Sequence, residues 1–173
     1  MDKTLFKKTE WQLYNYFENV SKIEAYQSKR DLLKKNIEEL ERRIKTTDVS
    51  LNSDVKSIGF SERVQTSNDG VSTAEKNMIN LIERLEREIE KKKAQIVDLE
   101  LSIMKMKEDN KPLDNFFDSR LKDYYRKLLE YKYGDGDSNI EICEKLSVSE
   151  TKFVKDKKKI IERVSRWGDS FLA

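Results

Sequence analysis

A heptad seam in the second half of the chain constrains the fold more than any other feature. Apolar residues recur there in alternating steps of three and four, and only Lys92 interrupts them. The seam consists of Met78, Ile82, Leu85, Ile89, Lys92, Ile96, Leu99, Ile103 and Met106. It predicts a long helix over 73–110 that pairs with another helix, because a stripe this narrow cannot be buried by one helix alone.

A second helical stripe lies near the start of the chain and can pair with this seam. Its apolar residues predict one long helix within 1–46, and they are Leu13, Phe17, Val20, Leu33, Ile37, Leu40 and Ile44. We expect the nearby aromatic residues Trp11, Tyr14, Tyr16 and Phe17 to pack as core. The two helices either form an antiparallel hairpin within one chain or join two copies as a homodimer. The pattern leaves both arrangements open.

The composition favours long, thin helices over a compact domain. Of the 173 residues, 39% are charged and only 36% are hydrophobic. The stretch 47–72 is rich in Ser, Thr, Asn and Asp and shows no sustained period, which indicates a polar or disordered linker. The expected fold class is therefore all-α, with a long coiled-coil-like arm (1–46, 47–72 and 73–110) followed by a small C-terminal domain over 111–173.

Several function classes are disfavoured by what the chain contains. It has no histidine and a single cysteine, Cys143, so we expect no metal site, no cofactor and no enzymatic activity. No segment approaches the roughly 18 consecutive apolar residues of a membrane span, and the N-terminus lacks a signal-peptide pattern. We expect a cytoplasmic protein. The formal net charge is only +2, so a case for nucleic-acid binding must rest on local charge.

The C-terminal domain shows strong boundary signals. We expect Asp109–Pro112 to end the arm, with a domain boundary near Lys111, because proline suits the first turn of a new helix. A helix with apolar residues from Leu113 to Leu129 then reaches about Tyr133 and stops at the glycines after it. Ser138, with glutamate three residues later, forms a capping box that predicts a short helix through Leu146.

A tight turn and a basic helix follow. Ser149 is a second candidate cap, and the helix that it starts extends to about Trp167. Phe153, Ile160, Ile161, Val164 and Trp167 share one side of it. Residues 151–167 contain seven Lys or Arg and two Asp or Glu, and most of these charges lie on the other side. A short helix, a three-residue turn and a longer helix with a basic face are typical of a helix-turn-helix.

The segment from Glu141 to Thr151, EICEKLSVSET, resembles the E-I-A-E-x-L-G-I-S-x-S segment of the promoter-binding helix-turn-helix of bacterial sigma factors. Cys143 stands for the usual alanine, and Ser147 for the usual glycine. The whole layout is similar to late-gene transcriptional activators of phages, of the RinA, ArpU and Xpf-like types, including an S-E-R-V-Q-like stretch at 61–65. The match is most specific from Tyr125 to Arg166. No segment matches the part of sigma factors that melts promoters. The resemblance therefore implies an activator or a partial sigma substitute, and not a full sigma factor, in a bacterial host cell, with host RNA polymerase as a partner.

We therefore expect sequence-specific binding of promoter DNA, with the basic helix in the major groove. Ser149 caps this helix. Thr151, Lys152, Lys155 and Asp156 are predicted to lie nearest the bases, and Lys158, Lys159 and Arg163 to contact phosphates. The alternative is a coiled-coil adaptor that binds only protein. Such an adaptor would be expected to carry apolar residues where the lysines stand.

Overall fold

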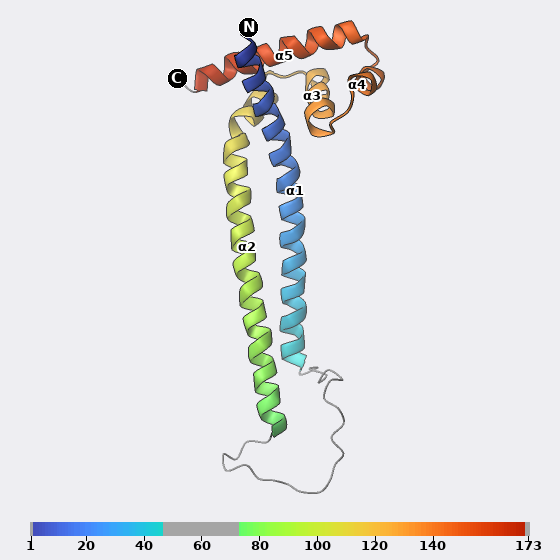
Figure 1. Ribbon diagram of the computed structural model, residues 1–173. Coiled ribbons are helices and arrows are strands. Elements are labelled where there is room, and N and C mark those ends of the chain that lie inside the picture. Colours follow the sequence, from blue (N-terminus) through green and yellow to red (C-terminus); the bar gives the residue numbers. More distant parts are fainter. Residues whose placement is uncertain (1, 47–72, 172–173) are drawn as a thin grey trace. The chain divides into compact units, whose positions relative to one another are not determined.

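The computed structural model describes residues 2–46 and 73–171, and this part of the chain is all-α, as predicted. The elements are α1 (Lys3–Thr46), α2 (Thr73–Arg120), α3 (Asp123–Leu129), the π-helical turn η1 (Glu130–Gly134), α4 (Asn139–Leu146) and α5 (Glu150–Phe171) (Figure 1). The predicted linker over 47–72 lies outside the described residues. In the described ranges, each helix is too short or too polar to cross a membrane.

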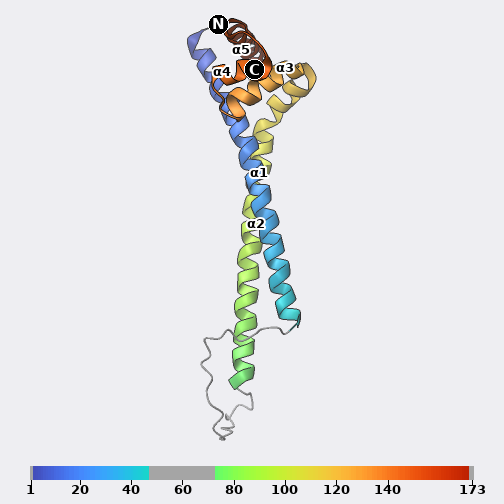
Figure 2. The same cartoon turned by 90° about the vertical axis from the view of Figure 1, so that its right-hand side faces the viewer.

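The chain divides into two compact units, of which one is Ser28–Glu100. In this unit α1 and α2 lie side by side and run in opposite directions (Figures 1 and 2). Leu33 and Ile37 of α1 are buried with Ile89 and Ile96 of α2, and Leu40, Ile44 and Leu99 pack against them. The centre of the predicted seam, at Ile89 and Ile96, is thus buried within one chain. Of the two arrangements that the sequence allows, the structure has the antiparallel pair.

Ion pairs accompany the apolar packing of this unit. The interrupting lysine, Lys92, is half-buried and forms an ion pair of 3.2 Å with Glu88 on its own helix. The ion pair between Lys34 and Glu100, at 3.6 Å, crosses between the helices. Exposed pairs of this kind contribute about 0–1 kcal/mol each. Apolar burial therefore stabilises the helix pair more than its charges do.

The other unit joins the beginning of the chain, up to Gln27, with the residues from Leu101 onward. Every helix in it contributes to one apolar core. The buried members are Leu13, Phe116, Phe117, Leu121, Leu128, Leu129, Tyr133, Ile142, Phe153, Ile160, Ile161 and Val164. The small C-terminal helices are therefore packed against the first turns of α1, which the sequence places more than 100 residues away.

The aromatic residues at the start of α1 divide between core and surface. Tyr16 and Phe17 pack against the core as predicted, and the Tyr16 ring meets Phe117 edge-on at 4.9 Å. The prediction is wrong for Trp11, which is 65% exposed, and for Tyr14, which is 48% exposed. The reason is helical geometry. The face of α1 centred on Leu13 is buried, and Trp11 lies about 200° around the helix from it.

The helix end expected at Asp109–Pro112 is absent, because α2 continues through Pro112 to Arg120. Contacts with α1 hold the helix on both sides of the proline. Before it, the buried Asn110 accepts a hydrogen bond from Asn19 and donates one to the carbonyl of Tyr16. After it, Phe117 packs on the Tyr16 ring. These contacts offset the hydrogen bond that proline cannot make.

The prediction of a single helix from Leu113 to Tyr133 is also wrong. The chain leaves the helical conformation at Leu121 and Lys122, and Lys122 adopts φ −72° and ψ 148°. Arg126 donates to the carbonyl of Phe117 at 2.9 Å, satisfying a backbone group at the end of α2. No glycine or proline marks this break. The break allows residues before and after it to enter one core, since Leu121 and Leu128 are both buried.

Candidate nucleic-acid interface

The predicted helix-turn-helix corresponds to α4, the turn 147–149 and α5. The predicted capping box is present at the start of α4. Ser138 accepts from the backbone N–H of Glu141, and the Glu141 carboxylate accepts from the backbone N–H of Ser138 at 2.8 Å. These bonds lower the pKa of Glu141 below its usual value. Ser149 caps α5 by accepting from the N–H of Lys152 at 3.4 Å, as predicted.

The turn depends on an unusual backbone conformation at Ser147. This residue has φ 52° and ψ 48°, the left-handed region, and it is the one described residue other than glycine with positive φ. Its N–H donates to the carbonyl of Glu144, and the N–H of Val148 donates to the carbonyl of Cys143. The chain therefore passes from α4 to α5 in a turn of three residues. Glycine, which the sigma-like pattern has at this position, adopts this conformation without strain.

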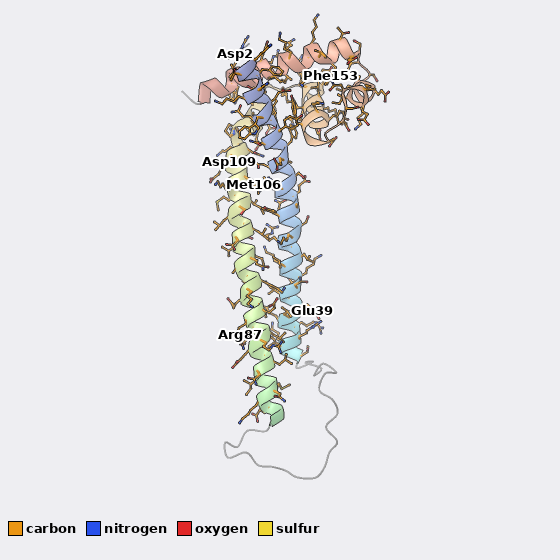
Figure 3. The ribbon with its side chains drawn as sticks, in the orientation of Figure 1. Asp2, Glu39, Arg87, Met106, Asp109 and Phe153 are labelled. Carbon is orange, nitrogen blue, oxygen red and sulfur yellow. The ribbon has the colours of Figure 1, made fainter. Side chains whose placement is uncertain are left out.

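One side of α5 enters the core, and Figure 3 marks Phe153 on this helix. Phe153, Ile160 and Ile161 are fully buried, and Val164 is 2% exposed. Cys143 of α4 is half-buried and packs against the same core. Because α5 is anchored along this side, its opposite side is presented to solvent in a fixed orientation.

The outward side of α5 carries predicted DNA contacts at helical spacing. Thr151, Lys155 and Lys158 occupy positions i, i+4 and i+7, and all three are exposed. Lys159 is exposed beside them. These residues form a continuous surface that we call the outward stripe, defined by Thr151, Lys155, Lys158 and Lys159. A positive surface of this kind is suited to anionic phosphates.

Other predicted residues lie on the flank of α5 that faces two tyrosines of α3. Asp156 accepts hydrogen bonds from the hydroxyl groups of Tyr124, at 3.0 Å, and Tyr125, at 3.5 Å. The Lys152 ammonium lies 5.5 Å from the centre of the Tyr124 ring, and the Arg163 guanidinium lies 5.9 Å from that of Tyr125. Asp156 thus orients the helix through α3. Its carboxylate is already engaged within the protein.

The tyrosine pair is a part of the site that the sequence did not reveal. Both tyrosines were expected simply as members of an apolar helix face. Their rings do pack against the core, but their hydroxyl groups reach α5. Burial, together with the hydrogen bond to Asp156, raises the pKa of Tyr124 to about 12. Tyr124 therefore remains a neutral hydrogen-bond donor at physiological pH. The one signal in the sequence was the presence of two adjacent tyrosines at positions where leucine would fill a purely apolar core, because a tyrosine hydroxyl group needs a hydrogen-bond partner.

A second missed contact anchors α5 to the beginning of the chain. Glu10 of α1 forms an ion pair of 2.7 Å with Lys157 and accepts a hydrogen bond of 2.9 Å from the hydroxyl group of Tyr133. Both partners in the ion pair are largely buried, with side chains 23% exposed. Lys157 is therefore a structural lysine, although it belongs to the same basic run as Lys155 and Lys158.

The described part of the chain contains no group of three Cys, Asp or Glu side chains placed to hold a metal ion. Comparison of the sequence with protein-family models and with curated proteins, and of the fold with solved structures, finds no match.

Proposed function

We propose that this chain is a sequence-specific DNA-binding protein that inserts α5 into the major groove and activates transcription. The observation that carries the proposal is the combination of a three-residue turn, with Ser147 in the left-handed conformation, and the outward stripe that follows it on α5. A helix-turn-helix uses such a turn to fix its second helix so that the first turns of that helix reach base edges.

The distribution of charge supports binding to an anionic partner. Lys155 and Lys158 are exposed at the centre of the stripe, whereas the nearby acidic Asp156 is turned toward Tyr124 and Tyr125. The Asp156 carboxylate is thus engaged with α3 and does not offset the charge of these lysines directly. An adaptor that binds only protein would gain little from a lysine-rich, apolar-poor face, because the centres of protein interfaces are depleted in charged residues.

Within this proposal, the residues of α5 divide into three roles. Thr151 and Lys155 lie nearest the bases, and Lys158 and Lys159 contact phosphates. Lys152, Asp156 and Arg163 act at the flank, where contacts with the tyrosines set the orientation of the helix. The activator role, promoter DNA and RNA polymerase as partners, and a bacterial host belong to the same proposal and rest on the sigma-like sequence from Glu141 to Thr151.

The direct experiment is selection of bound duplexes from a random DNA pool, followed by footprinting on the enriched sequence. The Lys155→Glu variant should lose the footprint while its helix content, measured by circular dichroism, is unchanged. Lys105→Glu, on an exposed part of α2, is the charge-matched control and should retain the footprint. Failure to enrich any sequence, or a footprint that survives in Lys155→Glu, would contradict the proposal.

A further inference from the structure

An exposed apolar side chain, Val154, lies at the edge of the outward stripe of α5. It is 55% exposed, although the neighbouring Phe153 is fully buried. Helical spacing places it on the side of the stripe that carries Thr151, three residues before it, and Lys158, four residues after it. We infer that Val154 contacts the 5-methyl group of a thymine in the major groove, an inference that rests on the proposed DNA binding.

The chemistry of Val154 matches one base. Each base pair shows a distinct pattern in the major groove, and among the four DNA bases only thymine presents a methyl group there. Valine has no polar atom, so it cannot satisfy a hydrogen-bonding base edge and would leave such an edge desolvated and unpaired. The nearby residues Thr151 and Lys155 have polar groups that can bond to neighbouring bases or phosphates. Val154 would then specify thymine at one position of the site.

The helix presents this side chain in a well-defined position. A β-branched residue in a helix is confined largely to one χ1 rotamer, so both methyl groups of Val154 point in fixed directions. The backbone beneath it is held by Phe153 in the core. The flank contacts between Asp156 and the tyrosines of α3 limit rotation of α5 about its axis. A rigid apolar group on a fixed helix is suited to discriminating a single methyl group.

The test replaces each thymine of the selected DNA, one at a time, with deoxyuridine, which removes only the methyl group. Binding is measured by fluorescence anisotropy at constant salt. We expect one position per bound protein where the replacement raises Kd about fourfold, the effect of burying one methyl-sized group. In Val154→Ala the same replacement should change Kd by less than about twofold. Ile140→Ala, which alters an exposed residue of α4, is the control and should keep the full wild-type effect.

The outcomes separate this inference from the function on which it rests. If no DNA is bound, the proposed function fails and the role of Val154 fails with it. If DNA is bound but every uridine replacement is tolerated, the inference is wrong and the function stands. The same holds if the sensitive position remains sensitive in Val154→Ala. Because Val154 is exposed, the alanine variant should fold normally, which circular dichroism verifies.

Discussion

Replacing Ser147 by glycine should stabilise the unit that contains the helix-turn-helix. Ser147 is exposed and has φ 52°. A left-handed conformation costs a residue with a Cβ atom about 1–2 kcal/mol. Glycine avoids that cost but loses about 0.5–1 kcal/mol through its greater freedom in the unfolded chain. The expected net gain in the free energy of unfolding is therefore about 0.5–1 kcal/mol.

Tryptophan fluorescence reports this unit selectively. The chain has two tryptophans, Trp11 and Trp167, and both belong to the unit that contains α3, α4 and α5. A urea titration followed by fluorescence should move to a higher midpoint in Ser147→Gly. With a slope of about 1–3 kcal/mol per molar urea, the shift is about 0.2–1 M.

Two further variants at this position test the physical cause. Ser147→Ala keeps the Cβ atom and should leave the midpoint nearly unchanged. Ser147→Asn should give a smaller gain than glycine, because asparagine tolerates the left-handed region better than most residues. The reasoning is refuted if glycine fails to raise the midpoint, or if alanine raises it equally, since the backbone strain at Ser147 would then be absent.

Three other predictions follow from the same unit. Phe153→Ala removes a fully buried ring and should lower the free energy of unfolding by about 3–5 kcal/mol in the same titration; a change below about 1 kcal/mol would show that α5 is not anchored there. Ser138→Ala should lower it by about 1 kcal/mol through loss of the capping box, and an unchanged midpoint would argue against that box. The pKa of Tyr124 is raised to about 12 in the folded protein. The neutral hydroxyl group therefore adds to the free energy of unfolding below about pH 10, and this stabilisation is lost as the pH rises toward 12. Tyr124→Phe should therefore lose less stability than wild type between pH 10 and 12, and equal losses would count against the hydrogen bond to Asp156.

The features that could be predicted from the sequence are those set by local patterns. The heptad seam from Met78 to Met106 predicted a long helix, because its period requires one continuous apolar stripe. The two serine caps, Ser138 and Ser149, located the starts of α4 and α5 because capping involves only neighbouring residues. The basic outward side of α5 followed from helical spacing alone.

The features that were missed depend on contacts between distant segments. Pro112 is an ordinary helix breaker by local rules, and only packing of Asn110 and Phe117 against α1 carries the helix past it. No local sequence signal marks the break at Lys122, because the break depends on how the residues before and after it pack into one core. The contact of Glu10 with Lys157 joins residues nearly 150 positions apart, so no local pattern could identify Glu10 as the partner of this lysine.

The salt dependence of DNA binding tests the central claim most directly. The association constant falls as salt rises, and each lysine that neutralises a phosphate makes the slope of log K against log salt concentration steeper by about 0.9. The measurement compares wild type with the double variant Lys158→Ala and Lys159→Ala on the selected duplex. The matched control replaces Lys105 and Lys107, two exposed lysines of α2, by alanine. The account predicts a slope flatter by about 1.8 for the α5 variant and no change for the control. An unchanged slope in the α5 variant, or an equal change in the control, would contradict the placement of α5 against DNA.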